Sequence, residues 1–180
     1  MKQEGQMIVK KEIVSRTDIA RRVKELGQAI SRDYSGRPLV MIGILNGAFI
    51  FLADLVREIE LPMEIDFLRV SSYGSGTCSS GTIQCTKDTE LDLTGKDILL
   101  VEDIVDTGRT LVRLKELLAT RKVASVKICA LIDKKERREV EVEVDYVGFV
   151  VAEGFLVGYG LDHAQQHRHY PAIYNIVSGG

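Results

Sequence analysis

The sequence has few cysteines and almost no net charge. Its three cysteines, Cys78, Cys85 and Cys129, are an odd number without C-x-x-C spacing, so they indicate neither a disulfide framework nor a zinc site. We expect three free thiols, as in a reducing compartment. The formal net charge of -2 is too close to neutral for a general nucleic-acid-binding protein, although it allows a local basic site.

The sequence also lacks a long uninterrupted apolar run. The longest stretch extends from Leu39 to Ala53, contains Asn46 and two glycines, and ends at Asp54. It is too short and too interrupted to span a bilayer, and it favours a buried strand that leads into a helix. The first six residues contain no apolar segment, so the sequence predicts no signal peptide and a cytoplasmic protein.

Strands and helices are predicted to alternate along the chain. Apolar residues at helical spacing predict helices over 15–34, 48–58 and 110–120. The continuous apolar run 39–45 predicts a strand covered on both faces, and further strands are predicted over 63–71, 97–102, 125–132, 145–150 and 155–159. This alternation predicts an α/β protein with a mainly parallel sheet. The Gly- and Ser-rich segment 72–81 is predicted to be a long loop, either a functional lid or a plain surface hairpin.

The strongest chemical signal lies between Ile98 and Leu111. A buried strand is predicted to end in two adjacent carboxylates, Glu102 and Asp103, and the turn 106–110 then opens a helix. Ligands of open parallel sheets bind beyond the carboxyl ends of the strands, and a helix start attracts phosphate. The two acids can accept hydrogen bonds from sugar hydroxyls or coordinate Mg²⁺. The segment therefore predicts a site suited to a ribose 5-phosphate.

The composition of the turn supports this interpretation. Gly108 lets the backbone approach a ligand closely, and the hydroxyls of Thr107 and Thr110 can donate hydrogen bonds. A single Asp-Thr-Gly would favour a simple helix cap with the acids in solvent, but the whole run at a strand end favours a ligand site. The sequence contains no G-x-x-x-x-G-K-[ST] loop and no G-x-G-x-x-G after a strand.

This segment resembles the phosphoribosyl pyrophosphate motif of the type I phosphoribosyltransferases. Further matches, in family order between about residues 39 and 171, resemble the bacterial-type hypoxanthine-guanine phosphoribosyltransferases. They are Gly43–Gly47, Ser71–Gly76, Leu131–Lys134 with Arg137 and Arg138, and Phe155–Asp162 with Arg168.

The resemblance implies the type I phosphoribosyltransferase fold. In that fold a mainly parallel central sheet is flanked by helices, with a small hood built from N- and C-terminal segments and a flexible lid loop. We expect a single domain over residues 1–180, with a core of about 35–150 and a hood from about 1–15 and 150–180.

The resemblance also implies a reaction. A Mg²⁺-dependent enzyme of purine salvage would transfer the 5-phosphoribosyl group of phosphoribosyl pyrophosphate to hypoxanthine or guanine, giving IMP or GMP and pyrophosphate. Asp106 is the implied catalytic base near the purine N7, and a carboxylate suits that task. Glu102 and Asp103 would hold ribose hydroxyls directly or through Mg²⁺, and Asp162 would bind a second Mg²⁺. The implied substrate-binding residues are Leu45, Asn46, Gly47, Ser72, Tyr73, Glu102, Asp103, Asp106, Thr107, Gly108, Arg109, Thr110, Lys134, Phe155, Leu156, Asp162 and Arg168.

By the same resemblance, three residues would recognise the base. Lys134 would donate to the purine O6, and because lysine only donates, it would select a 6-oxopurine over adenine. Phe155 would stack on the base and the Leu156 backbone would contact its edge. Without the resemblance, Lys134 would be one more solvated charge in the run 133–138 and Phe155 could equally be a core aromatic. Acids interleave that run, so it does not predict a nucleic-acid surface.

The pyrophosphate would be bound by two other segments. Residues 45–47 match the family's pyrophosphate loop, whose non-proline cis peptide would be the Leu45–Asn46 bond; an ordinary strand-to-helix turn is the alternative. Arg168 would bind the pyrophosphate, because Arg suits a multi-oxygen anion better than Lys. Many relatives have a basic residue at the position of Asn46, and some at that of Gly154, so the contacts at these two positions stay open.

The lid would carry Ser72 and Tyr73. Closing it would exclude water, which would otherwise hydrolyse the activated sugar. His163, His167 and His169 lie in a polar segment and favour surface histidines over metal ligands.

Other functions of the same fold stay open. A xanthine- or pyrimidine-specific relative, or a non-catalytic regulator that senses nucleotides, could share this fold. The presence of Asp106, Lys134, Asp162 and Arg168 disfavours the regulator. The expected partners are phosphoribosyl pyrophosphate, a purine base, the nucleotide and pyrophosphate, with no nucleic acid and no membrane. The resemblance implies a homodimer or homotetramer.

Overall fold

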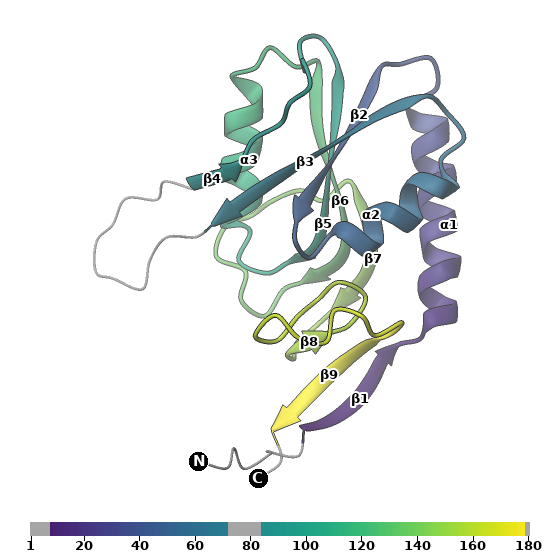
Figure 1. The fold of residues 1–180 in the computed structure, drawn as a ribbon, viewed down its shortest axis with the longest axis vertical. Helices are drawn as coiled ribbons and strands as arrows, with labels where there is room; N and C mark the ends of the chain where they lie inside the picture. Colours follow the sequence, from purple (N-terminus) through teal and green to yellow (C-terminus); the bar gives the residue numbers. More distant parts are fainter. Residues whose placement is uncertain (1–7, 72–83, 179–180) are drawn as a thin grey trace.

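The computed structural model describes residues 8–71 and 84–178, and its centre is a six-stranded sheet (Figure 1). The strand order is β4-β3-β2-β5-β6-β7; β4 pairs antiparallel with β3, and the other pairs are parallel. The predicted α/β class with a mainly parallel sheet is confirmed. The strands are β2 (Leu39–Leu45), β3 (Met63–Ser71), β4 (Gln84–Lys87), β5 (Asp97–Val105), β6 (Ser125–Lys134) and β7 (Tyr146–Val151).

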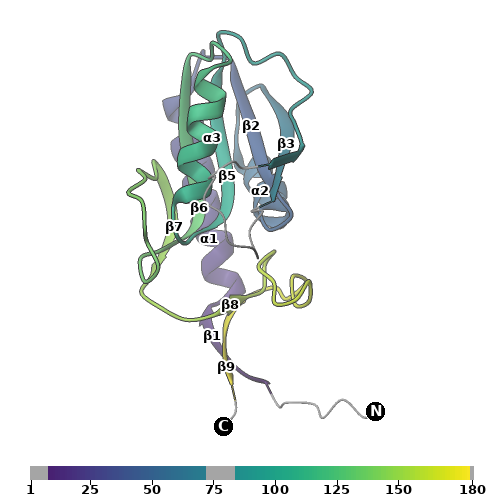
Figure 2. The same cartoon turned by 90° about the vertical axis from the view of Figure 1, so that its left-hand side faces the viewer.

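Helices cover both faces of this sheet (Figure 2). On one face lie α1 (Arg16–Asp33) and α2 (Phe49–Leu55), the latter followed by a 3-10 turn, η1 (Val56–Glu58); on the other lies α3 (Arg109–Ala119). Alternate residues of β2 divide between the two layers, because side chains of a strand alternate in direction. Met41 packs in the cluster of α1 and α2, and Ile42 packs in the cluster of α3. This explains the continuous apolar run of β2.

A second sheet joins the two ends of the described chain. It has three antiparallel strands in the order β1-β9-β8 (Figure 1). They are β1 (Ile8–Val14), β8 (Leu156–Val157) and β9 (Ile173–Ser178). The sequence predicted neither β1 nor β9 as a strand, nor β4. The predicted strand over 155–159 is wrong beyond Val157, because Gly158 and Tyr159 have φ values of 99° and 50° and turn the chain.

The predicted end of the third strand at Glu102 is also wrong. β5 continues to Val105, because its pairing with β6 persists as far as Val105 opposite Asp133. Its pairing with β2 ends earlier, at Val101 opposite Gly43. Glu102 and Asp103 therefore lie within the last part of β5, at the point where β2 has left it.

Within residues 8–71 and 84–178, no helix combines the length and the apolar character needed to cross a membrane. Cys85 and Cys129 are free thiols, as predicted, while Cys78 falls outside the described ranges.

A buried carboxylate holds the segment that precedes β5. Asp66 of β3 is 7% exposed and accepts hydrogen bonds from the backbone N–H groups of Phe67, Glu90 and Leu91, at 2.7, 2.7 and 3.1 Å. Burial by itself raises the pKa of this carboxyl, but the three N–H donors and the nearby Lys87 ammonium hold the pKa below its ordinary value. Ionised Asp66 is therefore a stabilising element of the fold.

The variant Asp66→Asn tests this role. At neutral pH we expect its free energy of unfolding to be lower by about 1–3 kcal/mol, since an acceptor for buried N–H groups is lost. The folded pKa is depressed, so the contribution is present above the unfolded pKa and is lost as pH falls through the folded pKa. In urea unfolding, the difference in stability between variant and wild type should therefore narrow as pH falls below 3.8, the ordinary pKa of an aspartate. The exposed Glu60→Gln is the control, and a gap that stays constant with pH would contradict the assignment.

Candidate active site

Three loops leave the carboxyl ends of β2, β5 and β6 on the side that faces the small sheet (Figure 1). After β2 come Asn46 and Gly47, after β5 comes the turn 106–110, and β6 ends at Lys134. Because Val105 lies opposite Asp133 in the register of β5 and β6, Asp106 and Lys134 are at the ends of neighbouring strands. The structure therefore brings these segments to one edge of the sheet, where ligands of open α/β sheets bind.

At this edge Glu102 is buried, and Asp103 beside it is half-buried. The Asp103 N–H donates to Glu102 Oε1 at 3.2 Å, and the Ile104 N–H donates to Asp103 Oδ1 at 2.9 Å. Burial, together with the neighbouring Asp103 charge, raises the pKa of Glu102 well above its ordinary value. Burial likewise raises the pKa of Asp103, although its hydrogen bonds and the Arg168 guanidinium act in the opposite direction. Two such carboxylates favour a cation or hydroxyl donors beside them.

The donor set fits a partly hydrated Mg²⁺ rather than a protein cage. Among the described residues, no group of three or more His, Cys, Asp or Glu side chains is placed to hold a metal ion. Asp162 therefore does not join Glu102 and Asp103 in one ligand set. Mg²⁺ is commonly held by one or two carboxylates together with substrate oxygens and water, and the acid pair suits that arrangement.

The turn after β2 is packed against Asp103 and the loop that follows β8. The Leu45–Asn46 peptide bond is cis, as predicted. A Cβ atom on Gly47 would lie 1.7 Å from Asp103 Oδ2, and one on Gly160 would lie 2.1 Å from the Gly47 carbonyl oxygen. Only glycine leaves room for these approaches, so the turn, the acid pair and the loop around Gly160 touch directly.

Arg168 and Asp162 lie in that same loop and are paired with each other. Arg168 Nη2 is 2.8 Å from Asp162 Oδ1, and Arg168 Nη1 donates to the Gly160 carbonyl at 2.7 Å. The Gln165 N–H donates to Asp162 Oδ2 at 2.8 Å. Through Gly160, both predicted residues are thus linked to the turn at Gly47.

The turn between β5 and α3 has the geometry of an anion cradle. Gly108, with φ of 84°, precedes α3 and brings no side chain to cap it. The Thr107 hydroxyl accepts only a long hydrogen bond of 3.4 Å from the Arg109 N–H. On the opposite side, the N–H groups of Glu139 and Val140 both donate to the Thr107 carbonyl at 3.0 Å. The first N–H groups of α3 are therefore suited to an anion.

The side chain of Arg138 connects the ends of β5 and β6. It is 6% exposed; its Nε donates to the Asp106 carbonyl at 3.0 Å, and its Nη2 donates to the Lys134 carbonyl at 3.2 Å. The same Nη2 donates to Val105 O at 3.2 Å and to Asp133 Oδ1 at 2.6 Å. The guanidinium fork thereby fixes the backbone of Asp106 relative to that of Lys134.

The side chains of Asp106 and Lys134 differ in the hydrogen-bond and ion-pair partners that they have. Asp106 Oδ1 is buried and accepts no hydrogen bond within the described part of the chain, while Oδ2 is 3.5 Å from Arg137 Nη1. Leaving a buried acceptor unpaired is unfavourable, so a hydrogen bond from a ligand N–H to this oxygen would be stabilising. The Lys134 side chain is 9% exposed, and its Nζ is 3.1 Å from Glu136 Oε2.

Phe155 is on the surface beside this edge. It is 52% exposed, and its ring meets His163 edge-on with centroids 5.2 Å apart, so the core alternative for Phe155 is wrong. Leu156 is buried. Ser72 and Tyr73, and with them the expected lid, lie outside the described residues.

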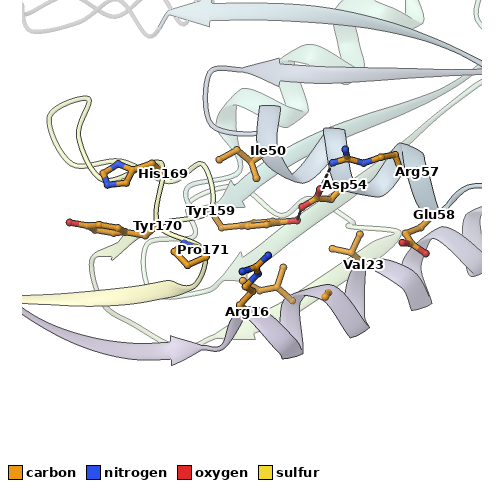
Figure 3. A pocket seen from close by; sticks show the side chains of 12 residues that line it. Arg16, Val23, Ile50, Asp54, Arg57, Glu58, Tyr159, His169, Tyr170 and Pro171 are labelled. Carbon is orange, nitrogen blue, oxygen red and sulfur yellow. Dashed lines mark hydrogen bonds and ion pairs between the residues drawn. The ribbon is translucent and has the colours of Figure 1, made fainter.

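A pocket of about 540 Å³ lies between α1, α2 and the loop after β8 (Figure 3). None of the predicted site residues lines it. At its floor the Tyr159 hydroxyl donates to Asp54 Oδ2 at 2.6 Å, and Asp54 Oδ1 is 2.5 Å from Arg57. Burial and the Asp54 carboxylate raise the pKa of Tyr159, which keeps its hydroxyl a donor. This bond ties the loop to α2, directly after the turn at Gly47.

The sequence interpretation assigned no role to several residues that shape the site. Arg138 was part of a matching motif, but its clamp on two carbonyls had no signal in the sequence. Glu136, Gly160 and Asn175 contact site segments that are distant in the chain, and only the folded arrangement shows this.

Comparison with known proteins gives consistent matches. The profile of the family described as "Phosphoribosyl transferase domain" matches residues 10–164. The chain is 45% identical over 167 residues to a hypoxanthine phosphoribosyltransferase of Salmonella typhimurium, covering 92% of this chain and 94% of that protein. It is 48% identical over 165 residues to a hypoxanthine-guanine phosphoribosyltransferase of Aquifex aeolicus, covering 91% and 93%.

A solved crystal structure shows the same similarity at the level of the fold. The crystal structure of a hypoxanthine phosphoribosyltransferase from Staphylococcus aureus superposes with a TM-score of 0.89 at 42% identity, covering 93% of this chain and 91% of that one. The similarity in sequence and in fold therefore extends over nearly the whole chain.

Two glycine variants test the cradle. Gly36 and Gly108 both have positive φ, but a Cβ on Gly36 meets nothing within 4 Å, whereas one on Gly108 would lie 2.3 Å from the Val140 carbonyl oxygen. We expect Gly36→Ala to lower the free energy of unfolding by about 1–2 kcal/mol. Gly108→Ala should lower it by at least about 1 kcal/mol more, because the backbone of residue 140 must move. Equal values for the two variants in urea unfolding would show that the close approach does not matter.

Proposed function

The chain belongs to the phosphoribosyl transferase family, and from this premise we propose that it transfers the 5-phosphoribosyl group of phosphoribosyl pyrophosphate to hypoxanthine or guanine. The products are IMP or GMP and pyrophosphate, which makes the protein an enzyme of purine salvage. One observation carries the proposal. An uncapped helix start, the acid pair Glu102 and Asp103, and Lys134 lie together at the ends of adjacent strands.

Asp106 is the proposed general base. Its buried Oδ1 has no hydrogen-bond partner within the described residues, so it is available to accept a proton from the purine N7. Its negative charge also favours an anomeric carbon with oxocarbenium character. Arg138 holds the backbone of Asp106, which keeps the carboxylate beside the cradle that binds the 5-phosphate. The cradle and the base thus orient the two reactants, and positioning of this kind is a large part of catalysis.

Glu102 and Asp103 are proposed to hold the ribose hydroxyls and Mg²⁺, with Asp162 holding a second Mg²⁺. When bound, the metal supplies charge neutralisation for the leaving pyrophosphate. Arg168, Gly47 and the backbone of Asn46 are proposed to bind the pyrophosphate. Asn46 carries no charge, so its contribution there is through the backbone.

Lys134 is proposed to select the base, with Phe155 stacking on it and the Leu156 backbone at its edge. An ammonium only donates, so it fits a purine 6-oxo group and not the amino group of adenine. The exposure of Phe155 supports a role in ligand contact, since a large apolar side chain is more stable when covered.

We also propose a cytoplasmic location and a homo-oligomer. The two free thiols at Cys85 and Cys129 support a reducing compartment. The exposed apolar ring of Phe49 on α2 supports an association surface. Light scattering on the purified protein gives the oligomeric state, and a monomer at micromolar concentration would contradict this part.

The variant Asp106→Asn tests the general base. We expect kcat to fall by about 10²–10⁴-fold, because an amide cannot take the proton, while KM for phosphoribosyl pyrophosphate changes little. Initial rates are measured by absorbance, with Asp92→Asn as an exposed control. Turnover close to wild type in the Asp106 variant would reject the assignment.

The base specificity is tested with four bases. We expect turnover of hypoxanthine or guanine, or both, that depends on Mg²⁺, and no turnover of adenine. Lys134→Ala should raise KM for the 6-oxopurines by about 10- to 100-fold, the scale of a hydrogen bond from a charged donor. A clear preference for xanthine would replace the proposed substrates, and nucleotide binding without turnover would favour a regulator. Unchanged kinetics in the Lys134 variant would remove Lys134 from base selection.

A further inference from the structure

One carboxylate, that of Glu136, joins two segments that approach the proposed base site from different directions. Glu136 lies in the loop after β6. Its Oε2 is 3.1 Å from the ammonium of Lys134 and also accepts a hydrogen bond from the Gly154 N–H at 3.3 Å. Lys134 ends β6, whereas Gly154 directly precedes Phe155 and the small sheet. A single oxygen atom therefore connects the end of the central sheet to the segment that presents the aromatic ring.

The segment around Gly154 is held from a second side. The Phe155 N–H donates to Asn175 Oδ1 of β9 at 2.9 Å, and the Phe155 carbonyl accepts from the Ile176 N–H at 2.9 Å. Gly154 has φ of 115°, and a Cβ there would lie 2.9 Å from the Asn175 side chain. Consecutive N–H groups at 154 and 155 are thus bound by Glu136 from the loop after β6 and by Asn175 from the small sheet.

The ammonium of Lys134 needs such a partner in order to point in a defined direction. Lysine carries three rotatable donors on a flexible stem. The stem is buried here, with the side chain 9% exposed, so the remaining freedom lies mainly at its end. Pairing one donor with Glu136 directs the other two. The Lys134 ammonium, and then the Gly154 N–H, lower the pKa of Glu136, so this carboxyl is ionised near neutral pH.

We propose that Glu136 is a positioning residue for base recognition: it sets the direction of the Lys134 donors and their separation from the ring of Phe155. Glu136 itself does not touch the base. This inference rests on the proposed function, because it gives Lys134 and Phe155 the roles of binding the purine edge and face. Its consequence is that affinity for a 6-oxopurine depends on a side chain that makes no contact with the purine.

The variants Glu136→Ala and Glu136→Gln separate the two bonds. Glu136→Ala removes both, and we expect KM for the purine base to rise by about threefold to tenfold, the combined scale of an exposed ion pair and one hydrogen bond. Glu136→Gln keeps an oxygen for the Gly154 N–H and loses the charge, so its effect should be smaller. KM for phosphoribosyl pyrophosphate and the melting temperature should stay at the wild-type values. Glu143→Gln, an exposed carboxylate of the same loop, is the matched control.

Combining Glu136→Ala with Lys134→Ala tests whether the effect passes through the ammonium. If it does, the loss caused by Glu136→Ala is smaller when Lys134 is already absent. An undiminished loss in that background would overturn the proposal. Unchanged base binding in Glu136→Ala would also overturn the proposal, because the carboxylate would then have no effect on recognition. Tighter base binding would overturn it too, because the carboxylate would then compete with the base for Lys134. A matching rise in both KM values with a lower melting temperature would show a merely structural role.

Direct binding separates this inference from the proposed function. Calorimetry with IMP and with ribose 5-phosphate needs no turnover: Glu136→Ala should weaken IMP binding by about threefold to tenfold and leave ribose 5-phosphate binding unchanged. If wild type binds IMP but does not turn over hypoxanthine, the proposed activity fails while the positioning role is still measured. Equal IMP affinity in wild type and Glu136→Ala overturns the positioning role alone.

Discussion

The continued pairing of β5 with β6, beyond the point where β2 leaves, is the constraint on which the site depends. Because the β5–β6 ladder persists to Val105 opposite Asp133, the acid pair is held in a rigid strand rather than in a loop. Because the β2–β5 ladder stops at Val101, the other side of that strand is open to the turn at Gly47. The difference in length between the two ladders thus holds the acid pair in a strand and leaves room beside that strand for the turn at Gly47.

The small sheet and its loop complete this edge from outside the central sheet. Tyr159 donates a hydrogen bond to Asp54 of α2. Gly160 of the same loop packs against the turn at Gly47, and Arg168 donates to the Gly160 carbonyl. The close approach of Gly160, Gly47 and Asp103 depends on glycine at both positions, because no Cβ fits there. The site is therefore assembled from segments whose mutual distances are set by close backbone approach.

The same edge concentrates polar groups that the folded chain leaves incompletely satisfied. Buried Glu102 and half-buried Asp103 are adjacent and have raised pKa values, and Asp106 Oδ1 is buried without a donor in the described residues. Each is unfavourable for the fold alone, and each would be relieved by a cation, a hydroxyl or an N–H of a ligand. Proteins retain such groups at functional sites, where a ligand that binds only the folded state stabilises that state.

The sequence by itself determined the class of the fold and predicted the chemistry at one strand end. The helical spacing of apolar residues in 15–34, the apolar run 39–45 and the segment from Glu102 to Thr110 are local patterns. They could therefore be interpreted without knowing what lies opposite them. Tertiary structure alone decided where β5 ends, that β1 and β9 pair, and that Glu136, Arg138 and Asn175 contact segments of the candidate site. Those facts depend on contacts between segments far apart in the chain, and no local pattern of residues encodes a distance between two distant segments.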